Sequence, residues 1–151
     1  MLNKLLKKII DKSFTGLCVT PISINFAHVF FKHDAYCIYF TTNNSYHIGI
    51  DHSLKNNRKA IIGAIVHELN HIEWELFSSD NYFKQDFKLY QSELKHKQRD
   101  EIYTDIQTIL KGYGKELLEL MNHYHKHPTL EYTNGSYCGL KSSDIKKLIK
   151  G

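Results

Sequence analysis

Residues 60–72 read Ala-Ile-Ile-Gly-Ala-Ile-Val-His-Glu-Leu-Asn-His-Ile and form the centre of the most regular segment of the chain. Within residues 57–77, apolar side chains recur at intervals of three and four, the spacing of one helix face: Ile61, Ile65, Leu69, Ile72 and Leu76. An asparagine at position 56 or 57 is expected to cap this helix, because its side-chain oxygen can accept a free main-chain N–H. We therefore predict a long helix over 57–77 with this apolar face in the core.

The same helix carries the motif His67-Glu68-Leu69-Asn70-His71, which has the form His-Glu-x-x-His. Residues i and i+4 lie one turn apart on one face, so both imidazoles can reach one metal ion, and Glu68 projects beside them, close enough to deprotonate a metal-activated water. In a chain of this composition the motif is expected by chance only about 0.03 times. The competing interpretation is a solvated helix face with two unrelated histidines.

A catalytic zinc site of this kind needs a third protein ligand. A metzincin would continue with glycine at position 74 and histidine at position 77, but the chain has Trp74 and Phe77, which excludes that class. A second long helix is predicted over 92–111, and there Glu101 and Asp105 lie four residues apart on one face. Glu101 is favoured as the metal ligand, with Asp105 hydrogen-bonded to the outer nitrogen of a liganding histidine. The alternatives left open are Glu93, then His96 and Asp100.

The chain as a whole predicts a single domain of the α+β class, spanning residues 1–151. Residues 2–10 alternate leucine and isoleucine with lysine at helical spacing, which predicts an amphipathic first helix that ends at Thr15-Gly16. Three runs rich in β-branched and aromatic residues follow, at 24–32, 36–42 and 46–50. Because short turn-forming spacers separate these runs, we predict a three-stranded antiparallel sheet with hairpin connections.

More helices are predicted after the motif helix. Gly112 should end the second long helix, because glycine commonly terminates helices, and a third helix is expected over 115–125. A last short helix is expected at the C-terminal end, capped by Ser142 or Ser143 and ending near Lys150. The predicted order is an N-terminal helix, the sheet, the motif helix, the glutamate helix and C-terminal helices.

The composition is that of a globular protein, with 42% hydrophobic and 24% charged residues. No apolar run approaches the ~18 residues of a membrane span, and the N-terminal segment lacks the features of a secretion signal, so a cytoplasmic protein is expected. Three widely spaced cysteines fit neither a disulfide framework nor a Cys-x-x-Cys zinc site. Lysines concentrate at both ends of the chain, which has a net charge of +4. Solvated helix faces explain them at least as well as an anionic partner does.

A second group of histidines lies at residues 123–127, which read His-Tyr-His-Lys-His. His123 and His127 could share a helix face and bind a metal. However, Pro128 makes the helix end there, and cations in a last helical turn interact favourably with the helix dipole. A solvated helix end is therefore the preferred interpretation of this group.

The combination of His67-Glu68-x-x-His71 with Glu101-x-x-x-Asp105 resembles the gluzincin metallopeptidases, particularly the minigluzincins and the catalytic core of the heat-shock and prenyl-protein peptidases. The resemblance extends over about residues 46–114. Two departures from the family pattern are Asn70, where glycine is common, and Thr104, where alanine is usual. Neither removes a ligand, but Asn70 could narrow the space beside the active helix.

The resemblance implies a small zinc-dependent metallopeptidase that hydrolyses peptide bonds of a peptide or protein substrate. Zinc would be held by His67, His71 and Glu101, and a zinc-activated water would be deprotonated by Glu68 as general base. In such enzymes the strand before the motif helix forms a rim to which an extended substrate adds as a further strand. Here that strand comprises Tyr46, His47, Ile48, Gly49 and Ile50. Candidates for the donor that stabilises the oxyanion are Tyr103, Tyr113, His123 and Tyr124.

Two other functions stay open from sequence. A metal-binding domain of this fold could be inactive or latent and serve as a regulatory or binding module, although an intact Glu68 favours the enzyme. A basic nucleic-acid-binding protein with an incidental motif would show salt-sensitive binding that survives a chelator. The chain contains no recognisable nucleic-acid motif, which makes this second alternative the weaker one.

Overall fold

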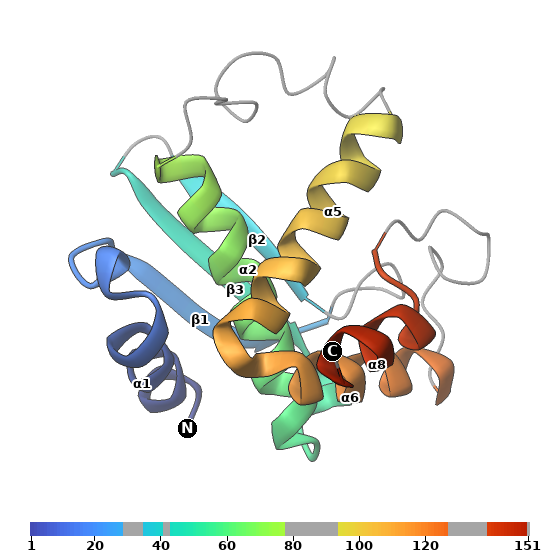
Figure 1. Cartoon of the computed structure of the whole chain (residues 1–151). Coiled ribbons are helices and arrows are strands. Elements are labelled where there is room, and N and C mark those ends of the chain that lie inside the picture. Colours follow the sequence, from blue (N-terminus) through green and yellow to red (C-terminus); the bar gives the residue numbers. More distant parts are fainter. Residues whose placement is uncertain (29–34, 41–42, 78–93, 127–138, 151) are drawn as a thin grey trace.

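The structure is a computed structural model that describes residues 1–28, 35–40, 43–77, 94–126 and 139–150. It combines helices with one small sheet (Figure 1). The main elements in chain order are α1 (Leu2–Ser13), β1 (Ile22–Ala27), β2 (Ala35–Phe40), β3 (Ser45–Asp51), α2 (Arg58–Phe77), α5 (Leu94–Thr108), α6 (Gly114–Lys126) and α8 (Ser142–Lys150). One-turn helices at Thr15–Leu17 (η1) and His52–Leu54 (η2) and a π-helical turn at Ile109–Tyr113 (η3) complete the described elements.

The long motif helix predicted over 57–77 is confirmed as α2, Arg58–Phe77. The Asn57 side chain caps it by accepting the Ala60 main-chain N–H at 3.1 Å. The predicted core face is buried at four positions: Ile61, Ile65, Leu69 and Ile72. Leu76 was also predicted in the core, and that is wrong, since the last turn of α2 reaches the surface and both Leu76 and Phe77 are exposed.

Helix α2 is buried on more than one side because it packs both against the sheet and against α6. Gly63 marks the closest approach to α6. A Cβ atom at this position would lie 2.5 Å from the main-chain oxygen of Glu116, which is closer than real Cβ contacts. The missing side chain therefore lets the two helix backbones approach each other directly.

The sheet differs from the predicted antiparallel meander. Its strand order is β1-β3-β2, with β3 antiparallel to β2 but parallel to β1. The hairpin predicted at residues 43–45 is present between β2 and β3, with Asn44 at a positive φ of 51°. The expected hairpin between the first two strands is wrong. β3 takes the central position between the other two strands, and its side chains Tyr46, Ile48 and Ile50 are almost fully buried.

The terminal helices match the sequence pattern. The apolar side of α1 is buried in the core through Leu2, Leu5, Leu6, Ile9 and Ile10. Gly112 separates α5 from α6 as predicted, and its φ of 93° lies in the left-handed region that favours glycine. Helix α8 begins at Ser142 itself, and the Lys141 carbonyl accepts from Asp144 and Ile145, so neither serine precedes the helix as a cap.

Within the described part of the chain, none of the helices combines the length and the apolar character needed to cross a membrane.

We expect Gly63→Ala to destabilise the fold, because the new methyl group would meet the α6 backbone rather than a flexible side chain. Overpacking of this kind costs about 2 kcal/mol, or roughly 4–8 °C in Tm for a domain of this size. Thermal unfolding followed by circular dichroism measures the change. Lys59→Ala, at an exposed position of the same helix, is the control and should leave Tm nearly unchanged. An unchanged Tm for Gly63→Ala would contradict the close α2–α6 approach.

Candidate metal centre

His67, His71 and Glu101 come together between α2 and α5. Their ligand atoms all lie within 4.8 Å of one another. Nε2 of His67 lies 3.2 Å from Nε2 of His71, and the two Glu101 carboxylate oxygens lie 3.1 Å and 3.2 Å from these nitrogens. The structure therefore brings the three sequence-predicted ligands into one group that can hold a metal ion.

The spacing of this group can be compared with that of a tetrahedral zinc site. Zinc binds nitrogen and oxygen at about 2.0–2.1 Å, and tetrahedral angles then separate neighbouring ligand atoms by about 3.3 Å. The 3.2 Å between the two histidine nitrogens is close to this value, and each nitrogen faces a different oxygen of Glu101, at 3.1 Å and 3.2 Å. With one ligand atom from each residue, the three atoms lie within 4.8 Å of one another. The side chains are also partly accessible, with exposed fractions of 15%, 19% and 29%. The donor atoms thus fit a metal ion, and solvent reaches the group.

Glu68 lies beside the pair of histidines on α2 and is 8% exposed. Its charge is close enough to His71 to raise the pKa of that imidazole. This is the neighbourhood that the His-Glu-x-x-His spacing predicts for a base next to a metal ion.

Asp105 lies behind His67, as predicted. Its Oδ1 lies 3.0 Å from Nδ1 of His67, so the imidazole donates its outer N–H to this carboxylate and keeps Nε2 free for a metal. Asp105 is buried, and its second oxygen accepts the main-chain N–H of Leu140 at 2.8 Å. No sequence pattern indicates the Leu140 contact, because every residue except proline carries a main-chain N–H.

His71 has a neighbour of its own on α5. The Oγ1 of Thr104 lies 3.5 Å from Nδ1 of His71 and donates to the Asp100 carbonyl at 2.7 Å. Thr104, one of the two departures from the gluzincin pattern, therefore places a polar atom where alanine has none. Adjacent residues of α5, Thr104 and Asp105, thus face the two histidines separately.

Asn70, the other departure, points into the interface between α2 and α5. Its amide donates to Thr108 Oγ1 at 2.9 Å, and its oxygen accepts from Lys111 Nζ at 2.7 Å. Lys111 also donates to Glu73 at 2.9 Å. The Asn70 side chain is therefore part of the contact that holds the two ligand-bearing helices together. The sequence reasoning did not find this network.

The charges of the centre are strongly coupled. Burial lowers the pKa of His67, but the carboxylates of Glu101 and Asp105 outweigh this and hold it well above 6.5. The pKa of His71 is raised in the same way, again against the effect of burial. Burial raises the pKa of Glu101, yet the two imidazoles bring it well below 4.5. Without a metal, the group is thus an ion cluster with a protonated His67 at neutral pH.

Of the competing third ligands, Asp100 is the one whose side chain the structure describes, and it does not join this group. Asp100 lies 3.7 Å from Arg99 Nε and is not part of the metal-binding group found among the described residues. Glu93 lies outside the described residues, as does the side chain of His96.

The four candidates for an oxyanion donor lie in different surroundings. The Tyr113 hydroxyl lies 2.8 Å from Ser13 Oγ of α1. Tyr124 is half-buried and packs against the core. Tyr103 shares α5 with Glu101, and its ring lies 4.5 Å from that of Trp74.

His123 requires a correction as well as a placement. It is buried, and its Nε2 lies 3.1 Å from Ser53 Oγ, so the solvated helix end predicted for residues 123–127 is wrong at this position. The reason is that His123 lies on the core side of α6 with Leu120, whereas His125 is exposed. His127 lies outside the described residues.

The predicted rim strand has no free edge. Tyr46, His47, Ile48, Gly49 and Ile50 all belong to β3, and each of them pairs with β1 on one side and with β2 on the other. The prediction that a substrate adds to this strand is therefore wrong. The nitrogens of His47 lie 2.7 Å from Ser23 Oγ and 3.1 Å from Asn25 Oδ1, both on β1.

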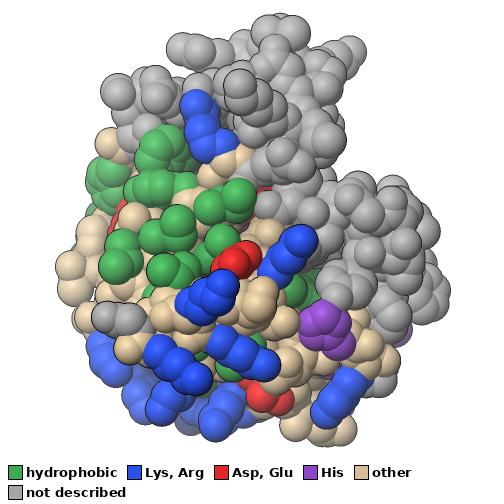
Figure 2. All heavy atoms as spheres, turned by 45° about the vertical axis from the view of Figure 1, so that its right-hand side comes forward, with side chains coloured by type: hydrophobic (Ala, Val, Ile, Leu, Met, Phe, Trp, Pro, Cys, Tyr) green, Lys and Arg blue, Asp and Glu red, His purple; other side chains and the backbone are tan. Residues whose placement is uncertain are grey.

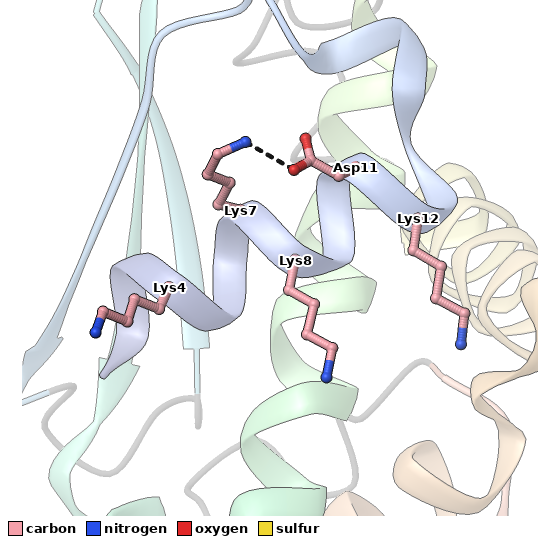
Figure 3. Close-up of a pocket in the computed structure, with 5 residues that line it drawn as sticks. All are labelled: Lys4, Lys7, Lys8, Asp11 and Lys12. Atoms are coloured by element: carbon pink, nitrogen blue, oxygen red, sulfur yellow. Dashed lines mark hydrogen bonds and ion pairs between the residues drawn. The ribbon is translucent and has the colours of Figure 1, made fainter.

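A basic groove on α1 is a separate surface feature. Figure 3 shows its lining residues, Lys4, Lys7, Lys8, Asp11 and Lys12. Lys7 forms an exposed ion pair with Asp11 at 2.7 Å. Figure 2 shows lysine and arginine side chains gathered over the lower part of the face in view. The groove contains no histidine and one carboxylate, so its donors are unsuited to a zinc ion.

The chain matches no family model, no curated protein and no solved structure. The function must therefore be argued from the arrangement of the side chains.

We expect His71→Ala and Glu101→Gln to abolish tight metal binding, because each variant removes one of three converging donors. Loss of an outer-shell partner alone costs 10–100-fold in affinity, so the loss here should exceed about 100-fold. Competition against a chromogenic zinc chelator measures this affinity. His125→Ala, an exposed histidine of α6, should bind zinc like the wild type. Equal affinity in all three variants would contradict the proposed centre.

Metal binding should release protons at pH 7. Although burial lowers both pKa values, Glu101 raises that of His71 and helps to hold that of His67 well above 6.5, so a metal must displace the proton of His67. Calorimetric titration of zinc in buffers of different ionisation enthalpy should show release of about one proton or more. The release should shrink as the pH rises through the His67 pKa, and apparent affinity should fall as the pH is lowered. A titration without proton release at pH 7 would contradict the ion cluster.

Proposed function

We propose that this chain is a small zinc-dependent peptidase in which Glu68 acts as general base. The observation that supports this most directly is the convergence of His67, His71 and Glu101 from two helices, at separations of 3.1–3.2 Å. The partly exposed donors favour a site that meets substrate over a closed structural site.

The donor set favours zinc among the common metal ions. Two imidazole nitrogens with one carboxylate oxygen are typical of catalytic zinc sites, whereas calcium and magnesium prefer oxygen donors. A bound zinc ion would supply Lewis acidity, lowering the pKa of a water molecule and polarising a carbonyl group. The Asp105 carboxylate would keep the His67 Nδ1 proton in place, so that Nε2 remains the liganding atom.

Glu68 supports a hydrolytic function rather than metal storage. Its carboxylate lies on the same helix as both histidines, and its charge acts on His71. From this position it would accept a proton from the attacking water and return it to the leaving amine. A site that only stored a metal would have no use for a carboxylate in this place.

The sheet limits how an extended peptide can bind. Because β3 is paired on both sides, a substrate strand could add only to β1 or β2, the outer strands of the described sheet. Pairing through main-chain groups favours an unfolded segment or a loop as the substrate, since it must be extended to join the edge.

Glu68→Gln tests the proposal. It should lower the rate of peptide cleavage about 10²–10⁴-fold, the typical contribution of a general base, because the amide cannot take the proton. Zinc affinity should stay within about threefold, since Glu68 is not a ligand. Cleavage of an unfolded, dye-quenched protein substrate by the zinc-loaded chain measures the rate.

Glu73→Gln is the matched control on the same helix, because its side chain can still accept from Lys111. It should cleave like the wild type. Equal activity of Glu68→Gln would refute the proposed base. Zinc binding without any cleavage would favour the alternative of an inactive binding module. Salt-sensitive nucleic-acid binding that survives a chelator, and depends on the lysines of α1, would favour the third function.

A further inference from the structure

We infer that the main-chain N–H of Leu140 is a positioning group of the metal centre, through which the C-terminal segment 139–150 sets the geometry of His67. This inference rests on the metal centre of the proposed function. It adds a positioning role for a segment that lies 35 residues beyond Asp105 in the chain.

Both oxygens of the Asp105 carboxylate have hydrogen-bond partners. One oxygen lies 3.0 Å from His67 Nδ1, and the other accepts the Leu140 N–H at 2.8 Å. Asp105 is 1% exposed, so water has little access to replace a lost donor. Two donors on opposite oxygens fix the rotation of the carboxylate plane, and the plane in turn fixes the direction in which the imidazole points.

Packing of the C-terminal segment holds Leu140 in place. Its side chain is half-buried and packs against the core. Helix α8 follows directly, with Ile145 fully buried. Ile149 contacts Gly114 so closely that a Cβ atom added to Gly114 would lie 2.7 Å from Cγ1 of Ile149. The docking of α8 therefore holds the 139–141 backbone in place over Asp105.

Helix α8 is linked to the metal centre through the elements on which it packs. Helix α8 packs on α6 and on the η3 turn (Figure 1). These elements continue the chain from α5, which carries Glu101 and Asp105. The C-terminal segment thus packs on the elements that follow α5 and also contacts α5 directly, through the Leu140 N–H and Asp105. Its loss would remove the one donor to this carboxylate oxygen that the described residues provide.

Leu140→Pro tests this role, because proline removes the N–H while keeping an apolar side chain. Gly139 precedes it, and glycine tolerates the restricted backbone before a proline. Zinc affinity should fall 10–100-fold, as for other losses of an outer-shell partner. Leu140→Ala is the matched control. It keeps the N–H, and its zinc affinity should stay within about threefold even if Tm falls.

A double-mutant cycle separates positioning from general loss of stability. In an Asp105→Ala background, Leu140→Pro should have no further effect on zinc affinity, because the N–H then has no carboxylate to hold. The visible spectrum of the cobalt-loaded chain should change alike in Leu140→Pro and Asp105→Ala. Additive losses, or equal affinities of Leu140→Pro and Leu140→Ala, would overturn the inference.

If Leu140→Pro does not fold, an amide-to-ester replacement at the 139–140 bond gives the same test with the side chain unchanged. The natural Cys138 allows a synthetic peptide 138–151 to be ligated to residues 1–137. The ester should lower zinc affinity 10–100-fold, and an unchanged affinity would overturn the inference. Because every measurement is of metal binding, a chain that binds zinc but cleaves nothing would refute only the peptidase.

Discussion

The structure depends on one polar interface between α2, which is buried in the apolar core, and α5, whose buried side chains are polar and whose Ile102 and Ile106 are exposed. Along one face of α2 lie His67, Asn70 and His71, and along the facing side of α5 lie Asp105, Thr108 and Glu101. Each of these six side chains meets a partner, at distances of 2.9–3.2 Å. Because an unpaired polar group in such a place is costly, the relative position of the helices is narrowly determined.

This interface explains how the centre can exist before any metal binds. Against the effect of burial, the Glu101 carboxylate raises the pKa values of the two imidazoles, and the imidazoles lower the pKa of Glu101. In the metal-free protein, protonated histidine therefore provides the positive charge that balances the carboxylates. The metal then replaces protons rather than assembling scattered side chains. The close contact of α2 with α6 at Gly63, and the network around Asn70, hold the backbone that presents these groups.

Some of the features that position the metal centre can be predicted from sequence, and others cannot. The apolar period of α2, the asparagine cap and the glycine at 112 are local signals, and each was predicted because it acts within a few residues of itself. The order of the strands was not predicted. Alternation of apolar residues identifies a strand but not its neighbour, and here the third strand along the chain lies between the other two. Because the neighbours of a strand were not predicted, the expectation that residues 46–50 have a free edge for substrate was also wrong.

By itself, the sequence determined the helix that carries His67 and His71, the placement of Glu101 and Asp105 on one face of a second helix, and the chemistry that such donors favour. These follow from spacing along a helix, which is the same in any fold. Tertiary structure alone decided which strand is central, that His123 is buried against Ser53, and that the Leu140 N–H reaches Asp105. Those contacts join residues 35 or more positions apart or depend on main-chain groups, and neither leaves a periodic trace in the order of the amino acids.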